Sequence, residues 1–515
     1  MRKRLLTTFL TAALIAASTG AAGASEPGLV RTDTGPVRGT VAEGYQTYQG
    51  IPFAAPPVGE LRWRSPQPVT PWTEPRDATR PGGACAQSAG GGQKNENEDC
   101  LYLNVTTPSR HGRKPVMLWL HGGGNSYLSA DGFDAKRLAT QGGVVVVTTN
   151  FRLGFFGFLA HPDLPGSGAF GLEDQQAALR WVQRNAAAFG GDPGDVTVFG
   201  ESGGAFDVCA HLVAPGSRGL FQRAIAQSGG CSITWPDNAV INGFPASSPW
   251  VAKAKAEADG AALGTQLGCS TAECLRKLPA AAFTAIDRGP TPIEFGNRVL
   301  PQHPAEALAQ GRIARVPVIW GNTRDEGRLT AATVPDDPAT EPDEFTEDVY
   351  RGLLTQAYGD KAGRVAAEYP SSKFGGSPRV AYGAVLTDGT WACHQLADDR
   401  LLARRTPTYA FEFADRTAPV GFFGPFVPKG FPMGAFHSSD VAYLFDIPMF
   451  DLNPEQRKLA DQMIGYWTRF AATGNPNARG LPAWPQRAVQ SLAPGQISQV
   501  DGFQEHDCAF WASLR

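Results

Sequence analysis

The sequence feature that most constrains this chain is a serine set between glycines directly after a run of β-branched residues. Residues 196–199 read Val-Thr-Val-Phe, and residues 200–204 read Gly-Glu-Ser-Gly-Gly. A Gly-x-Ser-x-Gly turn between a strand and a helix is so tight that the positions around the serine must lack side chains. We therefore predict a nucleophile elbow with Ser202 at its tip, followed by a helix over residues 205–213. The alternative is a glycine-rich turn with a structural serine, because glycine makes up 60 of the 515 residues.

Short apolar runs alternate with helical patterns along the chain, which is typical of the α/β class with a mostly parallel sheet. We expect buried strands at residues 116–120, 144–149, 196–199, 316–320 and 408–413. Apolar residues recur at helical spacing over residues 172–185 and 454–473, which predicts two helices. One face of the longer helix carries Leu459, Met463, Trp467 and Phe470.

Two regions are rich in turn-forming residues and are expected to be loops, residues 260–301 and 417–434. The second region contains four phenylalanines, Phe422, Phe423, Phe426 and Phe431. Because exposing four large apolar side chains to water is unfavourable, we expect them to pack over another part of the protein. A substrate channel and an ordinary core are both compatible with this pattern.

The composition excludes several classes of protein. The chain has 46 basic and 49 acidic residues, a net charge of −3, and 42% hydrophobic residues. It is therefore too apolar and too weakly charged to be intrinsically disordered. A sequence pI of about 6.3 gives no general electrostatic reason to bind nucleic acid or an acidic membrane.

The amino terminus has the pattern of a secretory signal peptide. Three basic residues precede an apolar stretch over residues 5–17, and small residues follow. The apolar stretch is too short to span a hydrocarbon core of about 30 Å, which argues against a membrane anchor. We expect residues 1–24 to be cleaved, which leaves a secreted protein without a membrane anchor that forms a single domain over residues 25–515.

The chain has an even number of cysteines, which favours disulfides in an oxidising compartment. They are Cys85, Cys100, Cys209, Cys231, Cys269, Cys274, Cys393 and Cys508. Their spacing favours two local pairs, Cys85–Cys100 and Cys269–Cys274. No Cys-x-x-Cys pair and no histidine cluster occurs in the sequence, so we expect no metal site.

A second glycine run supports the elbow. Residues 118–120 read Leu-Trp-Leu and lead into His-Gly-Gly-Gly-Asn at residues 121–125. Attack of a serine on an acyl carbon creates an oxyanion, which needs preorganised N–H donors. We expect those donors to be the amides of Gly123, Gly124 and Gly203. A phosphate-binding loop is the alternative, but the run lacks the Lys-Ser/Thr ending of a P-loop.

A serine nucleophile needs a histidine base and an acid that orients it, in the chain order serine, acid, histidine. The histidines after Ser202 are His211, His303, His394, His437 and His506. The position of His437 after the phenylalanine-rich loop favours it as the base. Asp325 and Glu326 follow a predicted strand and are both candidates for the acid. The residues themselves leave this choice open, because either could instead pair with Arg324.

Several long motifs give the chain a clear resemblance to a known family. Residues 98–104 read Glu-Asp-Cys-Leu-Tyr-Leu-Asn, and Phe-Gly-Gly-Asp-Pro at residues 189–193 precedes the elbow. With these motifs the chain resembles the type-B carboxylesterases, the cholinesterase-like branch of the α/β-hydrolases. The resemblance implies the α/β-hydrolase fold, a mostly parallel central sheet flanked by helices. It also implies long loop and helical insertions that shape a substrate gorge.

The resemblance assigns roles to individual residues. It implies a triad of Ser202, Glu326 and His437, with an oxyanion hole from Gly123, Gly124 and Gly203. Supporting roles around the triad are implied for Glu201, Ser228 and Asp440. Family members usually have alanine after the nucleophile, where this chain has Gly203. The family has no cofactor, and we expect none here.

The resemblance also implies a disulfide pattern, namely Cys85–Cys100, Cys269–Cys274 and Cys393–Cys508. Cys209 and Cys231 remain, and we hypothesise that they pair and tie the elbow helix to the loop after residues 227–229.

Two features bear on the substrate. Cholinesterases bind the quaternary ammonium with a tryptophan in the first disulfide loop, whereas residues 86–99 contain no aromatic residue here. Choline esters are therefore poor candidates. Trp235 falls where family members build the acyl pocket, and Phe422 and Phe423 are further candidates for lining the substrate pocket. An ordinary hydrophobic wall explains Trp235 equally well.

These observations predict a secreted serine hydrolase that cleaves carboxylic esters through an acyl-enzyme. Its expected partner is a small-molecule ester, its expected state is a monomer, and it should bind neither nucleic acid nor membrane. The alternatives are a lipase, or a hydrolase dedicated to one ester, lactone or carbamate. A binding protein of the same fold without activity is a further alternative, which the complete set of expected catalytic residues disfavours.

Overall fold

The computed structural model describes residues 26–89, 94–164, 166, 168–239, 243–287, 289–334 and 345–514. The expected signal peptide, residues 1–24, lies outside the described residues. Within the described ranges, no helix combines the length and the apolar character needed to cross a membrane.

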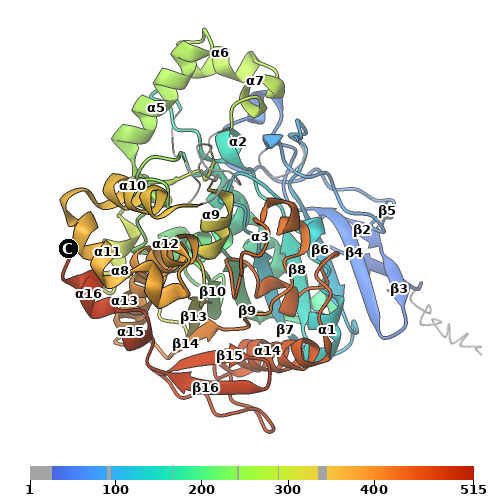
Figure 1. Ribbon diagram of the computed structural model, residues 1–515. Coiled ribbons are helices and arrows are strands. Elements are labelled where there is room, and N and C mark those ends of the chain that lie inside the picture. The colour runs from blue at the N-terminus through green and yellow to red at the C-terminus, as the bar shows by residue number, and fades with distance from the viewer. Residues whose placement is uncertain are drawn as a thin grey trace, which may run out of the picture.

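A twisted 11-stranded sheet forms the centre of the protein (Figure 1). From one edge to the other its strands are β16 (Gln496–Val500), β15 (Val489–Ala493), β14 (Thr408–Phe413), β13 (Val318–Thr323), β10 (Arg223–Gln227), β9 (Gly191–Glu201), β7 (Lys114–Leu120), β8 (Val145–Thr149), β6 (Tyr102–Thr107), β4 (Tyr45–Pro52) and β3 (Thr40–Ala42). Every neighbouring pair from β15 to β8 is parallel, and antiparallel strands continue the sheet at both ends. The expected α/β class with a mostly parallel sheet is confirmed.

The sheet is buried on both faces, which explains why its central strands are apolar throughout. In β9, Val196 and Val198 pack into one core and Phe199 packs into the other. Successive side chains of a strand point to opposite faces, so helices on both sides must cover them. The first core contains α3 (Phe170–Asn185) and α4 (Gly203–Val213), and the second contains α1 (Lys136–Gly142) and α14 (Pro454–Thr473).

Helix α14 spans the predicted residues 454–473, and its local signals explain its ends. The side chain of Asn453 accepts a hydrogen bond from the backbone of Gln456, whose own side chain accepts from the backbone of Asn453. This capping box fixes the first turn, and Gly474 ends the helix with a left-handed φ of +73°. The four apolar side chains expected on one face are all fully buried against the sheet.

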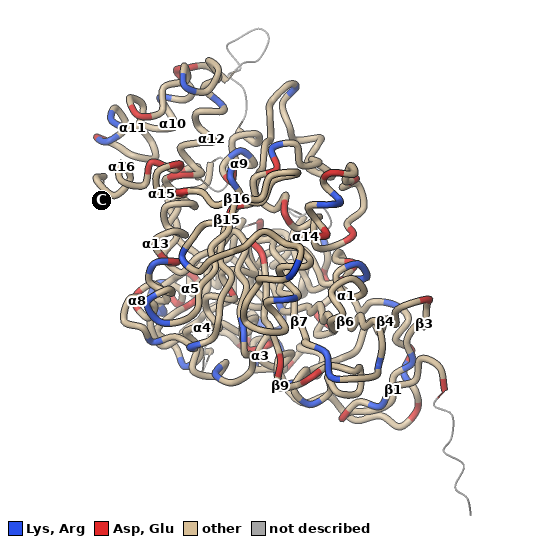
Figure 2. The backbone as a smooth tube through the Cα atoms, turned by 90° about the horizontal axis from the view of Figure 1, so that it is seen from below, with Lys and Arg blue, Asp and Glu red and all other residues tan. Residues whose placement is uncertain are grey.

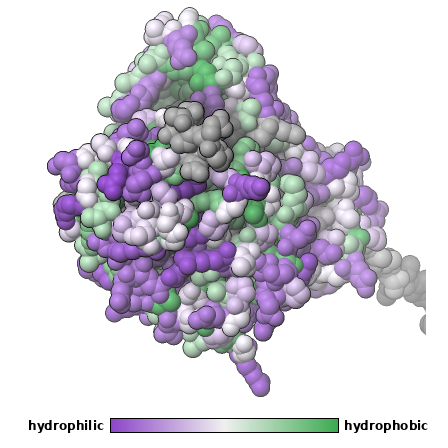
Figure 3. All heavy atoms as spheres, in the orientation of Figure 1, coloured by the Kyte–Doolittle hydropathy of each residue, from purple (hydrophilic) through white to green (hydrophobic). Residues whose placement is uncertain are grey.

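Three helices form a lobe that projects from the main body at the top of Figure 1: α5 (Lys253–Gln266), α6 (Ala272–Lys277) and α7 (Ala280–Thr284). The prediction of a loop over residues 260–301 is therefore wrong for its first half. Gly260 lies inside α5 because the helix passes close to another backbone, where a Cβ would lie 1.8 Å from the oxygen of Ala160. Close packing, not chain breaking, accounts for this glycine. Figure 3 shows hydrophobic residues on the face of this lobe among hydrophilic ones.

The remaining elements surround the sheet. The other helices are α2 (Gly154–Phe158), α8 (Pro304–Ala309), α9 (Arg328–Thr333), α10 (Glu347–Tyr358), α11 (Ala362–Glu368), α12 (Pro378–Leu386), α13 (Cys393–Leu402), α15 (Gly502–Glu505) and α16 (Cys508–Ala512). Two small sheets contain β1 (Leu29–Arg31), β2 (Pro36–Arg38) and β5 (Arg76–Asp77), and β11 (Trp250–Ala252) with β12 (Ile293–Phe295). Basic and acidic residues are interspersed along the chain in Figure 2.

All eight cysteines are paired. The disulfides are Cys85–Cys100, Cys209–Cys231, Cys269–Cys274 and Cys393–Cys508. These are the pairs expected from the resemblance, together with the hypothesised Cys209–Cys231 bridge. It joins α4 to the segment after β10, next to the elbow.

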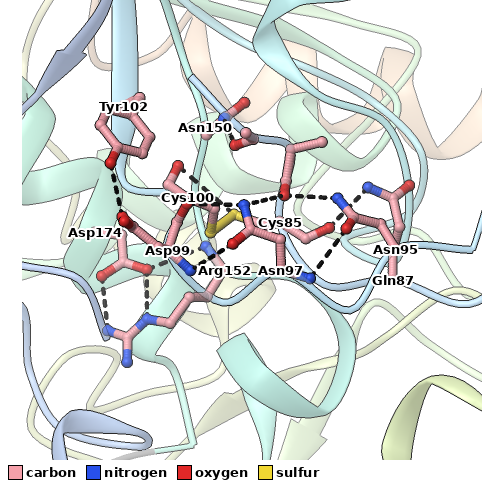
Figure 4. Close-up of a disulfide and its surroundings, with 12 residues drawn as sticks. Cys85, Gln87, Asn95, Asn97, Asp99, Cys100, Tyr102, Asn150, Arg152 and Asp174 are labelled. Carbon is pink, nitrogen blue, oxygen red and sulfur yellow. Dashed lines mark hydrogen bonds and ion pairs between the residues drawn. A yellow bond between two sulfur atoms is a disulfide. The ribbon is translucent and has the colours of Figure 1, made fainter. Parts of the chain in front are cut away.

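The first disulfide closes a loop that is held together by polar side chains (Figure 4). The backbones of Gln87 and Asn95 exchange two hydrogen bonds of 2.8 and 3.0 Å across the loop. Asn97 Nδ2 donates to the carbonyl of Asp99 at 2.8 Å, and Tyr102 Oη donates to the Asp99 carboxylate at 2.8 Å. Residues 85–89 and 94–100, the parts of this loop that the structure describes, are therefore cross-linked to each other and carry no aromatic side chain.

Candidate active site

The elbow forms where β9 ends and α4 begins. The backbone of Ser202 has a φ of +54°, a left-handed conformation that residues other than glycine adopt only under strain. Its amide donates to the carbonyl of Gln227 at 2.9 Å, which holds the turn against β10. At Gly204 a Cβ would lie 2.0 Å from the oxygen of Leu120, so the turn needs glycine there. Strain that neighbouring contacts maintain is typical of functional sites.

Three side chains from distant parts of the sequence meet at this elbow. His437 Nε2 lies 2.9 Å from Ser202 Oγ, and His437 Nδ1 lies 2.5 Å from Glu326 Oε2. The sequence separations are 235 and 111 residues. Glu326 is fully buried just after β13, and His437 lies in the loop between β14 and α14. A hydroxyl, an imidazole and a carboxylate in this order can activate the hydroxyl as a nucleophile.

The structure separates the two candidate acids, between which the residues themselves left the choice open and the family resemblance implied Glu326. Asp325 points away from the histidine ring and binds Arg416 at 3.0 Å and Arg328 at 3.0 Å. It also accepts a hydrogen bond of 3.0 Å from the amide of Ala435, two residues before His437. Of the two candidates only Glu326 contacts the ring, and Asp325 holds the backbone of the loop that carries it. Arg324 pairs with neither and binds Glu412 and Glu505.

Carboxylates dominate the electrostatics around the imidazole. Burial alone lowers the pKa of His437, but Glu326 and Glu201 outweigh this effect and raise the pKa to about 9. Glu201 Oε1 lies 3.4 Å from His437 Nε2, and burial raises the pKa of Glu201 to about 8. The surroundings therefore stabilise the imidazolium, the form that exists after a histidine has taken the proton of a serine.

The glycine run forms a loop beside the elbow. A Cβ at Gly122 would lie 3.3 Å from Cβ of Ser202, so this loop passes directly over the serine. Within the described residues, the amides of Gly123, Gly124 and Gly203 donate no hydrogen bond to the protein. They are thus available to an oxyanion formed at Ser202.

Close packing against the glycine loop explains the glycine at position 203. A Cβ there would lie 2.8 Å from the amide nitrogen of Gly124 and 2.9 Å from that of Asn125. Such distances are too short for a side chain, so the glycine loop packs against the start of α4 more closely than an alanine would permit. This explains why Gly203 departs from the family pattern noted in the sequence.

Of the three predicted supporting residues, Glu201 and Asp440 lie in the cluster around His437, and Ser228 directly follows β10. Ser438 Oγ donates to Glu201 at 2.5 Å, and Gln227 Nε2 donates to Asp440 at 2.7 Å. Burial raises the pKa of Asp440 to about 6. The hydroxyl of Ser228 is buried and has no hydrogen-bond partner among the described residues.

Aromatic side chains line the approach to the histidine. The ring centroid of Trp391 lies 4.7 Å from that of His437, and the ring centroid of Trp235 lies 6.1 Å from that of Trp391. Trp235 also lines a cavity of about 380 Å³ together with Gly124 and Asn125. This arrangement sets the predicted pocket residue Trp235 beside the glycine loop.

The phenylalanine-rich loop differs from the expectation that all four rings would be covered. Phe426 is 66% exposed and Phe422 is 43% exposed. Phe423 packs against Phe436, the neighbour of His437, with ring centroids 5.6 Å apart. The loop is anchored by Phe423 and Phe431, which leaves the other two rings at the surface. Neither Phe422 nor Phe423 lines the cavity next to Trp235.

The other histidines after the elbow have structural partners. His211, near the end of α4, lies in a buried hydrogen-bonded chain with Gln175 and Ser217, and His506 lies between Asp388 and Glu412. His394 contacts the carbonyl of Ser232, and His303 caps α8. Among the described residues there is no group of three or more side chains suited to hold a metal ion.

Sequence reasoning missed three residues of this site, Trp391, Ser438 and Asn125. Trp391 belongs to a π-helical turn at Thr387–Ala392, a kind of irregularity that often marks functional sites but has no clear sequence pattern. Ser438 directly follows the predicted histidine, and Asn125 directly follows the predicted glycines, so proximity in sequence was the available signal.

Comparison with known proteins shows to which family the chain is similar. The sequence matches the carboxylesterase family over residues 26–511. Carboxylesterase 1D of Rattus norvegicus is 32% identical over 97% of this chain and 95% of that protein. Acetylcholinesterase of Bungarus fasciatus is 33% identical over 94% of this chain and 85% of that protein. The solved structure of a thermophilic pNB esterase has a TM-score of 0.76 and 29% identity, and the match covers 94% of this chain and 99% of that one.

The parallel sheet with its helical layers is the α/β-hydrolase fold shared with these esterases. The match extends over nearly the whole described chain. The chain therefore belongs to the carboxylesterase family of carboxylic ester hydrolases.

Proposed function

We propose that this chain is a secreted serine esterase with Ser202 as nucleophile, His437 as general base and Glu326 as the acid that orients it. The observation that carries the proposal is the continuous hydrogen-bonded series from Ser202 Oγ through the imidazole to Glu326. Family membership supports ester hydrolysis, and the series supplies the chemistry for it.

The reaction follows from the positions of the atoms. His437 Nε2 takes the proton of Ser202 as Oγ attacks the ester carbonyl, and the resulting oxyanion is bound by the amides of Gly123, Gly124 and Gly203. When the intermediate collapses, His437 returns the proton to the departing alcohol and an acyl-serine remains. Water then attacks the acyl group, with His437 again as base, and the acid leaves. Glu326 fixes the ring orientation and stabilises the imidazolium in both steps.

The substrate we propose is a small neutral or anionic ester and not a choline ester. The described part of the first disulfide loop is held by amide and carboxylate side chains (Figure 4), and residues 86–99 contain no aromatic residue in the sequence. A quaternary ammonium needs an aromatic face in the site, which this loop cannot supply.

Secretion is part of the proposal. Four disulfides connect all eight cysteines, and such bonds persist in oxidising compartments. The expected signal peptide at residues 1–24 supplies the export route. Mass spectrometry of protein from the culture medium would test it, and a mature chain that still begins with Met1 would contradict it.

The central experiment replaces the nucleophile. Ser202→Ala should reduce the hydrolysis of a soluble aryl butyrate to background and abolish labelling by a fluorophosphonate. Ser439→Ala is a matched control, because this buried serine lies two residues from His437 without contacting Ser202 in the hydrogen-bonded series. Labelling of the Ser202→Ala protein at another residue would refute the assignment.

A further inference from the structure

The glycine loop has an unusual backbone at three consecutive positions. Gly123, Gly124 and Asn125 have φ values of +87°, +59° and +58°. Glycine adopts this left-handed region freely, whereas asparagine does so only at an energetic cost that other contacts must offset. Two of these residues carry amides proposed to bind the oxyanion, so whatever holds Asn125 also holds those donors.

Asn125 is held by one side-chain bond and one backbone bond. Its Nδ2 donates to Asp207 Oδ1 at 3.1 Å, and its carbonyl accepts a hydrogen bond of 2.7 Å from the amide of Gly154. Asn125 is 2% exposed and Asp207 is fully buried. The side-chain bond is therefore shielded from water, where hydrogen bonds fix geometry most strongly.

The position of Asp207 gives this bond its importance. Asp207 lies one turn into α4, the helix that begins at Gly203 directly after the nucleophile. The proposed oxyanion donors come from two separate segments, the glycine loop and the start of α4. The bond between Asn125 and Asp207 joins these two segments through side chains.

Burial of the Asp207 carboxylate costs free energy of folding. Its second oxygen accepts a hydrogen bond of 2.6 Å from Gln175, whose Oε1 accepts from His211 Nε2 at 2.8 Å. His211 Nδ1 in turn lies 2.8 Å from Ser217 Oγ. Burial raises the pKa of Asp207 to about 7, and among the described residues the hydrogen bonds from Gln175 and Asn125, not a basic side chain, act against this rise. A carboxylate kept in a core without a cation is a burden on stability, which a functional role explains.

We propose that Asn125 and Asp207 are positioning residues that hold the amides of Gly123 and Gly124 in register with the amide of Gly203. They touch no reacting atom and act through the glycine loop. The inference rests on the proposed serine esterase function and extends it to residues that neither the elbow motif nor the glycine run contains. Because misplacing a catalytic group by about 1 Å can cost about a hundredfold in rate, the effect should appear in kcat.

The test compares variants that break this bond in different ways. Asn125→Gly removes the amide and keeps a residue that accepts a positive φ, so backbone strain does not confuse the result. Asp207→Ala removes the acceptor, whereas Asp207→Asn retains an oxygen that can accept from Asn125. Ser217→Ala is the matched control, since it removes a buried hydrogen bond of the same chain far from the glycine loop.

We expect kcat for a soluble butyrate ester to fall about tenfold to a hundredfold in Asn125→Gly and Asp207→Ala, with KM within about threefold of wild type. Asp207→Asn should recover most of the loss. The double variant should be no slower than the slower single variant, because both remove one interaction. Rates are expressed per active site titrated with a fluorophosphonate, so that unfolded protein does not contribute.

The inference is overturned if Asn125→Gly and Asp207→Ala lose thermal stability as Ser217→Ala does while kcat per titrated site is unchanged. Should Asn125→Gly fail to fold, the comparison of Asp207→Asn with Asp207→Ala decides, and equal kcat values in that pair would contradict the inference. Wild type and Ser202→Ala are measured in parallel. If Ser202→Ala remained active, the serine esterase proposal itself would fail, which is distinct from a failure of the positioning role.

Discussion

His437 and His506 both lie beside carboxylates, but His506 is buried whereas the side chain of His437 is 13% exposed, and their second ring nitrogens meet different partners. His437 binds Glu326 through Nδ1 and faces Ser202 through Nε2 at 2.9 Å. His506 contacts Asp388 through Nδ1 and Glu412 through Nε2, both at 2.6 Å. A ring with a carboxylate on each nitrogen must carry protons on both, whereas a ring that faces a hydroxyl can exchange one.

The difference shows how the same type of side chain can act in proton transfer at one place and in ion pairing at another. Burial lowers the pKa of His506, but its two carboxylates outweigh this and raise the pKa to about 10. His506 and Arg324 in turn hold the pKa of Glu412 below its usual range in spite of burial. This second cluster is a closed set of ion pairs that joins the C-terminal segment to β14. The cluster at His437 leaves one position open to a substrate.

Replacing each histidine with glutamine should separate the two roles most clearly. His437→Gln should lower kcat/KM by about a thousandfold or more, with little change in melting temperature, because the base is lost. His506→Gln should leave kcat per titrated site nearly unchanged but lower the free energy of unfolding by about 3–5 kcal/mol, because Asp388 and Glu412 both lose the charge of His506 and Glu412 keeps only Arg324. Kinetics and urea denaturation of both variants test this. A large loss of kcat in folded His506→Gln would contradict the comparison.

Removing the Cys393–Cys508 disulfide should lower the stability of the region around His506 without changing catalysis at His437. This bridge closes a loop of 115 residues and holds α16, which follows His506, to α13. In the chain-entropy model a loop of about 100 residues is worth roughly 4–5 kcal/mol. We expect the double variant Cys393→Ala/Cys508→Ala to melt at a lower temperature with kcat retained. Loss of kcat at temperatures where the variant is folded would show that the two regions are coupled.

The two histidines should also respond differently to pH. As the proposed base His437 must be neutral, so kcat/KM should rise with pH along a limb whose midpoint lies well above the unperturbed pKa of 6.5, near the raised value of about 9. His506 stabilises the fold when charged. Its contribution is complete below pH 6.5, where the unfolded state is also protonated, and is lost as pH rises through about 10. A pH series of kcat/KM and of urea midpoints measures both limbs, and an activity limb centred below pH 6.5 would contradict the site electrostatics.

Of these variants, Glu201→Gln should have the smallest effect on activity. It tests how much Glu201 contributes to the raised pKa of His437. Glu201 lies 3.4 Å from Nε2 and raises the pKa of the imidazole when it is ionised. Removing its charge should move the acidic limb of kcat/KM to lower pH by about one unit. Asp325→Asn is a suitable comparison, since Asp325 does not contact the ring. An unchanged limb in Glu201→Gln would show that Glu326 alone sets the pKa of His437.

Short-range patterns predicted the local structure well. Helix α14 has the predicted bounds because Asn453, Gln456 and Gly474 act within a turn of each end. The elbow follows β9 as expected, although β9 begins at Gly191, five residues before the predicted strand. The region around Gly260 was misjudged, because a glycine that permits close packing looks the same in sequence as one that breaks a helix.

The sequence by itself determined the α/β class, the elbow at Ser202 and the glycine loop, because each depends on residues close together in the chain. The residues themselves left Asp325 and Glu326 open and the family resemblance implied Glu326, but only the tertiary structure brings Glu326 to His437 and Asn125 to Asp207. Neighbouring carboxylates differ in which way they point, and that direction is set by packing against Arg328, Arg416 and the loop before His437. The order of strands in the sheet, which brings together side chains 235 residues apart, is a property of the whole fold.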